Sequence, residues 1–335
     1  MKKYIKLYKQ KSDENLKEWK YRYPPLDQTA FEEDNRRVYR EHLQKNEWRN
    51  EMIKTKLYVS LLDATKEFGF FVAFQSRDFK MLNDVLYQTS RQNLLNQCMT
   101  ASGGCCARIL WDAPRSFACN DFEVIDCLFP RENPLFSDDS AYLDVSANLL
   151  RVLYYNEFEQ QSAAVGKANS FLEKKHTLWA KYVVLYFLAL VNRDAEQANN
   201  CLQELCKAHQ KKGKFYASEL EKCFASEIHG FYRLARIIDG DFFSKLKYPK
   251  HDSFFCEFEE WHKEQNYPKG QLFYVYPPEM DYINRIFEAQ MPKITLKETK
   301  TGGRIRIFPD EEKFAADLTE NTKRVCSSGK QRREE

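Results

Sequence analysis

Apolar residues recur at helical spacing over most of the chain, and the clearest run covers residues 158–239. Four amphipathic segments follow one another there, with small residues on one face and large apolar residues on the other. They read AAVGKANSFL, HTLWAKYVVLYFLALV, DAEQANNCLQELCKA and SELEKCFASEIHGFYRLARII. This pattern predicts antiparallel helix pairs that stack through alanine-sized contacts and present a broad surface. Such pairs assemble no reaction centre by themselves.

The first hundred residues are also expected to be helical. A charged lead-in over residues 1–25 precedes a long helical pattern that starts at Thr29 and becomes strongly apolar over residues 57–71. Gly69 either ends this pattern or marks a close packing contact. A further helix is expected over residues 78–101.

Residues 103–138 break the helical pattern, because they hold a glycine pair and three prolines. A short helix ending at Leu128 is expected there, capped by Asn120 or Asp121. The serines and aspartates that follow predict a cap for another helix over residues 141–156. This segment therefore predicts a connector between two helical regions.

The C-terminal third changes character. The segment HDSFFCEFEEWHKEQN predicts a helix, QLFYVY predicts a short β-like run, and PPEMDYINRIFEAQ predicts a helix with proline in its first turn. In the segment ITLKETKTGGRIRIF, apolar and polar residues alternate on both sides of a turn at residues 301–303. This pattern predicts a β-hairpin. Residues 310–321 predict a last helix.

Together these patterns predict a mainly α fold: an antiparallel helical-hairpin array or bundle with a small C-terminal β-hairpin. At 335 residues the chain is long enough for one large domain or two smaller ones. The expected organisation, in chain order, is an N-terminal helical region (1–102), a loop-rich connector (103–138), a helical-array domain (139–325) and a disordered tail (326–335).

The composition indicates a folded, cytoplasmic protein. Apolar residues make up 43% of the chain, which argues against disorder, and the net charge of +3 is too small for a dedicated nucleic-acid binder. The lysines near the N-terminus are expected on a solvated helix face. We expect no secretory signal and no membrane span, because the longest apolar run, residues 182–191, is half the length that a bilayer requires. The ten irregularly spaced cysteines fit free thiols in a reducing compartment.

Two groups of residues are candidates for chemical centres. His251, Cys256 and His262 are too far apart on a helix to converge on one ion, so we expect no metal. Cys105 and Cys106 follow two glycines, but no family signature surrounds them, and adjacent cysteines in an apolar context usually pack as small hydrophobes. An enzyme that uses one of these two thiols remains a third hypothesis.

Other catalytic patterns are missing from the sequence. It holds no phosphate loop, nucleophile elbow or HExxH helix, so we expect no cofactor and no catalytic residue. His229 precedes Gly230 in a predicted helix, where another element has room to pack closely, and is expected to be a core histidine hydrogen-bonded to backbone. Glu259 and Glu260, beside Trp261, are expected on the solvated face of their helix.

One cluster favours recognition. Aromatic residues gather with proline in FYVYPPEMDY, which contains Tyr274 and Tyr276, and Arg304 lies in the basic hairpin that follows. Tyrosine, tryptophan and arginine are the residue types that anchor protein interfaces. The alternative is that these aromatic residues close the end of the helical array as part of its core.

From residue 121 to residue 321 the order of features resembles bacterial immunity proteins of the Immunity protein 49 family. The segments that carry the resemblance are DFEVIDCLFPRENPLFSDDSAYLDV, the pair FLEKKHTLWAKY and LALVNRD, the helix ELEKCFASEIHGFYRLA, and YPPEMDYIN. The resemblance implies a predominantly helical cytoplasmic protein that binds one toxin domain and blocks its active site. It supplies no catalytic residues.

The sequence therefore favours a non-enzymatic immunity protein that neutralises a cognate antibacterial effector by stoichiometric binding. The candidate contact residues are Glu259, Glu260, Trp261, Tyr274, Tyr276 and Arg304. If the toxin is a nuclease, its basic cleft favours an acidic stretch such as residues 257–260. The alternative is a helical-repeat adaptor for protein–protein interaction. The oligomeric state and the activity of the toxin are left open.

Overall fold

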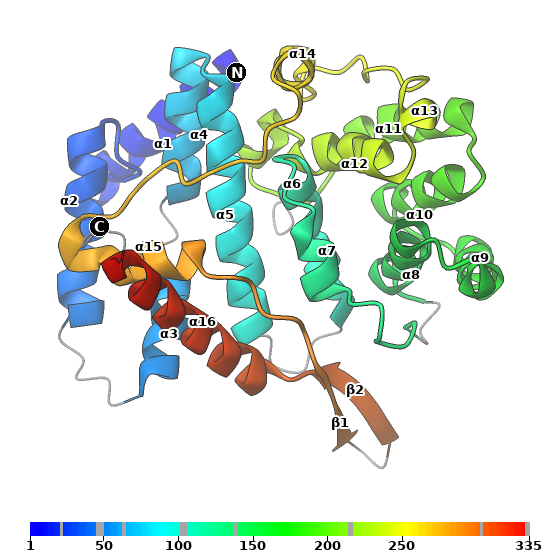
Figure 1. The fold of residues 1–335 in the computed structure, drawn as a ribbon. Coiled ribbons are helices and arrows are strands. Elements are labelled where there is room, and N and C mark those ends of the chain that lie inside the picture. Colours follow the sequence, from blue (N-terminus) through cyan, green and yellow to red (C-terminus); the bar gives the residue numbers. More distant parts are fainter. Residues whose placement is uncertain are drawn as a thin grey trace. The chain divides into compact units, whose positions relative to one another are not determined.

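The computed structural model describes residues 1–20, 23–44, 50–61, 65–100, 106–136, 140–213, 217–301 and 304–331 (Figure 1). Within these ranges the chain is mainly α-helical, with one two-stranded antiparallel sheet near the C-terminus, as the sequence predicts. The chain divides into two compact units. Unit 1 comprises Met1–Gly103 and Gly270–Glu335, and unit 2 comprises Gly104–Lys269.

Unit 1 combines the first helices of the chain with its last elements. The elements before the division are α1 (Lys2–Trp19), α2 (Gln28–Val38), the π-helical turn η1 (Tyr39–Gln44), α3 (Glu51–Leu61), α4 (Thr65–Ser76) and α5 (Phe79–Thr100). Those after it are η4 (Pro278–Met280), α15 (Asp281–Glu288), β1 (Leu296–Thr301), β2 (Arg304–Pro309) and α16 (Glu311–Gln331).

Stacked aromatic rings form much of the core of unit 1. Tyr8 of α1 stacks on Phe71 of α4 with ring centroids 4.3 Å apart, and Phe31 of α2 stacks on Phe68 at 4.4 Å. Helix α4 packs against α5, and a Cβ added at Gly69 would lie 2.7 Å from Val85 Cγ2. Gly69 is therefore a packing contact, one of the two roles expected for it, because a larger residue would force the two helices apart.

The segment that begins at Gly270 lies against α5. A Cβ at Gly270 would come within 2.5 Å of the Tyr87 Cβ, so only glycine lets the backbone approach this closely. The backbone N–H of Gln271 donates to Asp84 Oδ1 over 2.9 Å. The segment QLFYVY contains no strand, because its backbone bonds to side chains of α5 instead of to a neighbouring strand.

The C-terminal elements complete unit 1. Strands β1 and β2 pair antiparallel in the register Leu296–Pro309 to Thr301–Arg304, which confirms the predicted hairpin. Helix α16 packs on α3, α5 and α15, and this packing joins the end of the chain to its first hundred residues. It continues to Gln331, so residues 326–331, expected to be disordered, are helical, whereas residues 332–335 lie outside the described part.

Unit 2 holds the predicted array. Its elements are η2 (Cys106–Trp111), α6 (Ala113–Phe117), α7 (Glu123–Leu128), α8 (Tyr142–Tyr155), α9 (Phe158–Leu172), α10 (Leu178–Val191), α11 (Ala195–Gln210), η3 (Glu221–Cys223), α12 (Ser226–Ile238), α13 (Gly240–Phe243) and α14 (Cys256–Glu264). The range expected to be a loop-rich connector thus contains the short helices η2, α6 and α7, which belong to this unit.

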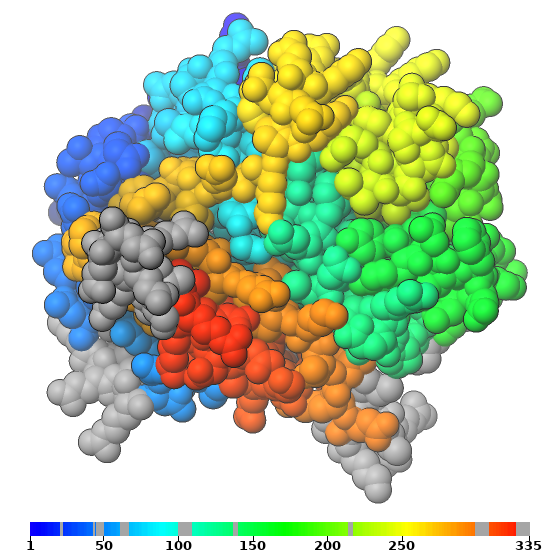
Figure 2. Space-filling model, viewed as in Figure 1, coloured from blue at the N-terminus to red at the C-terminus, as the bar shows by residue number. Residues whose placement is uncertain are grey.

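Helices α8 to α11 lie side by side as an array (Figure 1), and α10 is its central member. Helix α10 contacts α8, α9 and α11, and Val184, Phe187 and Leu190 on it are fully buried. Side chains fill the spaces that separate the ribbons of these helices (Figure 2). The buried helix expected from the apolar run at residues 182–191 is therefore confirmed.

Helix α12 crosses α6 at very short range. A Cβ on Gly230 would overlap the carbonyl oxygen of Pro114, so the two backbones are in direct contact. Helix α12 begins at Ser226, later than the sequence pattern suggested. Ser218 and Glu221 explain the delay, because each side chain accepts a hydrogen bond from the other's backbone N–H and the turn that they close leads into the separate short helix η3.

The long helical pattern from Thr29 is also divided in the structure. It contains the separate helices α2, α3 and α4, with η1 after α2. Helix α3 packs on α5 and α16, whereas α4 packs on α1 and α5. A single straight helix cannot follow both sets of neighbours, so the expectation of one continuous pattern was wrong.

Candidate functional site

A pocket of about 520 Å³ opens in unit 2 at the first turn of α10. Its aromatic walls are Trp111 at the end of η2, Tyr142 at the start of α8 and Trp179 in α10. The remaining lining residues come from the loop before α10 and from the end of α11: His176, Thr177, Leu178, Ala180, Ala208, Lys211, Lys212 and Gly213. Volumes of this size and mainly apolar linings are typical of ligand sites.

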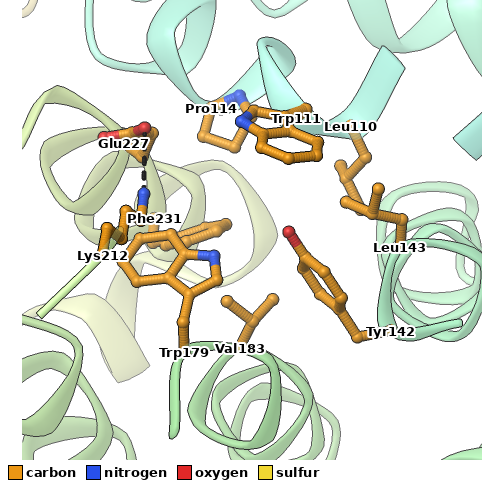
Figure 3. Close-up of a pocket in the computed structure, with 10 residues that line it drawn as sticks. All are labelled: Leu110, Trp111, Pro114, Tyr142, Leu143, Trp179, Val183, Lys212, Glu227 and Phe231. Atoms are coloured by element: carbon orange, nitrogen blue, oxygen red, sulfur yellow. Dashed lines mark hydrogen bonds and ion pairs between the residues drawn. The ribbon is translucent and has the colours of Figure 1, made fainter. Parts of the chain in front are cut away.

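The pocket continues into a smaller inner cavity of about 20 Å³, which shares Trp111, Tyr142, Trp179 and Lys212 with it. In Figure 3 the two indole rings lie on opposite sides of this cavity, and the hydroxyl of Tyr142 points into it between them. The other lining residues are Leu110, Pro114, Leu143, Val183, Glu227 and Phe231. A space of this size holds about one water molecule.

Lys212 occupies one wall of the pocket, where two partners hold its ammonium group. Its Nζ lies 3.4 Å from the centroid of the Trp179 indole and 3.3 Å from Glu227 Oε1 (Figure 3). Burial lowers the pKa of Lys212, and the negative charge of Glu227 opposes that shift. The side chain is only 9% exposed, so the cation–π contact and the ion pair stabilise a charge that has lost most of its water.

Glu227 connects this wall to a buried group of charges beneath the pocket. Arg115 Nη2 donates to Glu227 Oε1 over 3.0 Å, and Arg115 also pairs with Asp112. Burial raises the pKa of the Glu227 carboxyl, but the charges of Lys212 and Arg115 outweigh this effect and hold the pKa well below its ordinary value. Glu221 Oε1 also lies 3.8 Å from Arg115 Nη2, so two cations face three carboxylates and the group carries one excess negative charge.

His209 packs beside this charge group. Its Nε2–H donates to the backbone carbonyl of Glu221 over 3.1 Å, and its Nδ1 lies 3.8 Å from Glu227 Oε2. Burial lowers the pKa of His209, although Glu227 opposes the shift. We therefore assign the neutral tautomer that carries its proton on Nε2.

His176 forms part of the rim. Its ring stacks on Phe171 with centroids 3.5 Å apart, and its Nε2–H donates to the Phe171 carbonyl over 2.7 Å. Leu178, next to it on the rim, is 50% exposed. The rim thus combines an imidazole held by its own loop with an apolar side chain open to solvent.

The acidic stretch proposed from sequence does not lie where it was expected. Glu259 is fully buried: Arg233 Nε donates to its Oε2 over 2.6 Å, and His229 Nδ1–H donates to its Oε1 over 2.5 Å. Its placement on a solvated face was wrong, because this position of α14 faces α12. Glu260 is exposed and Trp261 is half-buried, so these two candidates remain at the surface, as does Glu257 of the same stretch.

Tyr274 and Tyr276 are buried as well, as the alternative reading held, but in the core of unit 1 and not at the end of the helical array, which belongs to unit 2. Gln88 bonds the backbone N–H and carbonyl of Tyr274, and Asn284 does the same for Tyr276. Arg304 begins β2, but its side chain lies outside the described part of the chain. The candidate contact residues belong to two different units, so they do not form one site within either.

His229 is the core histidine that the sequence predicts. The backbone N–H of Phe255 donates to its Nε2 over 3.2 Å, and Glu259 accepts from its Nδ1. Burial lowers the pKa of His229, whereas the hydrogen bond to Glu259 raises it. The ring is completely enclosed, so it has no access to a substrate.

The residues weighed for metal or thiol chemistry lie apart from the pocket. His251 bonds Ser253, and His262 Nδ1 accepts from Asn120. No group of three or more metal-ligating side chains occurs among the residues that the structure describes. Cys105 and the side chain of Cys106 lie outside the described part. Burial raises the pKa of two other thiols, those of Cys201 and Cys206, to about 12.

The pocket was not anticipated from the sequence. Trp179 stands in a strongly apolar helix, where it has the same periodicity as core residues, and Trp111 stands in a segment read as a connector. The available signal was the pair Lys211 and Lys212 at the end of a helix, followed by Gly213. That pattern marks a helix end and carries no information about a pocket.

Two further observations bear on identity. Among the described helices, none is both long enough and apolar enough to cross a membrane. No model of a known protein family matches the chain, and comparison with curated proteins and with solved structures finds no significant match.

Proposed function

We propose that this chain is a non-enzymatic cytoplasmic protein that binds one partner protein, and that the partner is the cognate toxin of an immunity pair. The resemblance of residues 121–321 to the Immunity protein 49 family motivates the choice of partner. One observation supports partner binding rather than catalysis. The ammonium group of Lys212 is engaged by both Glu227 and Trp179. A nucleophilic lysine acts as the neutral amine, whereas the Glu227 carboxylate favours the charged ammonium.

The other ionisable groups that line the pocket support the same conclusion. His176 gives its Nε2–H to a backbone carbonyl, and Glu227 is neutralised by Lys212 and Arg115. The pocket presents aromatic surface to a bound molecule, with the exposed Leu178 at its edge. Concave sites of this kind accept the few anchoring side chains that supply most of the affinity in protein complexes.

The experiment is a protection assay with the neighbouring gene. The open reading frame immediately upstream is expressed in a test bacterium with and without this chain. We expect growth arrest that this chain relieves, and a stable one-to-one complex of the purified proteins. A harmless neighbour, or purified chain that turns over a metabolite and loses that turnover after one point change, would contradict the proposal.

A matched pair of variants locates the interface. Leu178→Glu places a negative charge on the pocket rim, and Ile237→Glu does the same at an exposed apolar residue of α12 that does not line the pocket. We expect Leu178→Glu to weaken the complex by about tenfold or more, and Ile237→Glu to leave it unchanged. The reverse order would move the interface away from the pocket.

The second candidate function is a helical-repeat adaptor. Packing of α8, α9, α10 and α11 in series favours it, because such arrays present extended surfaces to peptides. Affinity capture separates the two functions. An adaptor retains several partners that share a short motif, whereas an immunity protein retains one.

A further inference from the structure

The mouth of the pocket is cationic. Lys211 lines it and is exposed, and Lys175, also exposed, directly precedes the lining residue His176. Within the described part of the chain neither lysine forms an ion pair. Lys174 adds a third positive charge to the same loop, and Glu173 adds one negative charge. The rim therefore carries a positive excess, which the single excess negative charge of the buried group beneath the pocket does not cancel.

The interior of the pocket is apolar and flat-walled. The rings of Trp111, Trp179 and Tyr142 form its sides, and the half-exposed Leu178 extends the apolar surface to the rim. A volume of about 520 Å³ accommodates a short peptide segment rather than a single small ion. Aromatic and branched side chains gain most from contact with such walls.

These two features specify one kind of occupant. We infer that the pocket binds an acidic peptide segment of the partner protein, with an aromatic or branched side chain against the indoles of Trp111 and Trp179 and a flanking carboxylate beside Lys211 and Lys175. This inference rests on the proposed function and names the chemistry of its partner. It also reverses the expectation stated for a nuclease toxin, in which this chain supplied the acidic group and the partner supplied the basic one.

The test uses two blocked tripeptides and the full chain. One has phenylalanine between two aspartates, and the other has phenylalanine between two asparagines, so the pair differs in charge but hardly in shape. The chain has five tryptophans, and incorporation of 5-fluorotryptophan gives each a separate ¹⁹F resonance, assigned by Trp→Phe substitution. The measured quantities are the resonance shifts and the dissociation constant of each tripeptide.

We expect the acidic tripeptide to shift the resonances of Trp111 and Trp179 and to leave Trp19, Trp48 and Trp261 unchanged. Its affinity should exceed that of the neutral tripeptide by about threefold or more, and the difference should shrink in high salt, since exposed charges are screened. Lys211→Glu should remove the difference. Lys263→Glu, the same change at an exposed position of α14 outside the pocket, should preserve it.

Equal affinities of the two tripeptides, shifts confined to other tryptophans, or no shift at about 10 mM peptide would each overturn the inference. The protection assay decides the proposed function independently. If the chain protects and the tripeptides fail, the immunity role stands and the pocket has a different occupant. If the acidic tripeptide binds as expected and no toxin is neutralised, the partner is not a toxin, while the chemistry of the pocket holds.

Discussion

Arg233 and Glu259 form a fully enclosed ion pair, with Arg233 Nε 2.6 Å from Glu259 Oε2. Burial raises the pKa of the Glu259 carboxyl, but Arg233 and the hydrogen bond from His229 outweigh it and lower the pKa below its ordinary value. The carboxylate therefore stays charged inside unit 2, where it joins α14 to α12. This pair holds the fold together and is not available to a partner protein.

Glu259→Ala should destabilise unit 2 strongly, because it leaves the Arg233 guanidinium buried without its counter-charge. We expect the free energy of unfolding to fall by about 3–5 kcal/mol. Glu260→Ala, the adjacent exposed position of α14, should change it by less than about 0.5 kcal/mol. Urea unfolding followed by circular dichroism measures both. Similar losses in the two variants would show that Glu259 is solvated after all.

The contact between α12 and α6 should make Gly230 intolerant of any side chain. Gly230→Ala places a methyl group in the carbonyl oxygen of Pro114, so we expect a large loss of thermal stability. Gly166→Ala on α9 is the matched control, since its Cβ meets nothing within 4 Å. We expect this control to gain about 0.5–1 kcal/mol from its better helix propensity. Equal tolerance at both positions would contradict the close crossing.

Unit 2 should lose stability as the pH falls below about 6.5. Burial lowers the pKa of His209, His229 and His262. At a given acidic pH the unfolded chain therefore binds more protons at these histidines than the folded chain does. The stabilisation is fully present above the unfolded pKa and decreases as pH falls toward the folded pKa, by at most about 1.4 kcal/mol per pH unit for each histidine. Unfolding free energies measured between pH 7.5 and 5 test the direction.

His262→Asn isolates one contribution to this slope. The asparagine oxygen replaces the Nδ1 acceptor for Asn120 but does not titrate. We expect the slope between pH 6.5 and 5 to fall by about 1 kcal/mol per pH unit. An unchanged slope in this variant would show that His262 is protonated in the folded protein.

The buried thiols should be inert in the native protein. With a pKa of about 12, fewer than about one in ten thousand molecules carry a thiolate at Cys201 or Cys206 at pH 7.5. Iodoacetamide followed by peptide mass spectrometry should leave both unmodified until denaturant is added. Rapid labelling of Cys105 or Cys106 under native conditions would instead revive the hypothesis of a thiol enzyme.

Much of the fold follows from local pattern. The helices of the array, the buried run of α10, the hairpin of β1 and β2, and the close approach at Gly230 can all be read from periodicity and turn residues, whereas the structure decided between the two roles open to Gly69. The failures have a common cause. Glu259 stands among charged residues, yet it shares the buried face of α14 with Phe258 and His262 because α12 lies there. A single helix does not encode which neighbour will cover it.

The sequence by itself determined the helical class of the protein, its small sheet and the absence of recognisable catalytic motifs, because these depend on residues close together along the chain. The tertiary structure decided the rest. It joined α15 and α16 to the first hundred residues and gathered Trp111, Tyr142, Trp179 and Lys212 around one pocket. These four residues come from segments far apart in sequence, so only the packing of η2 and α10 on α8, and of α11 on α10, brings them together.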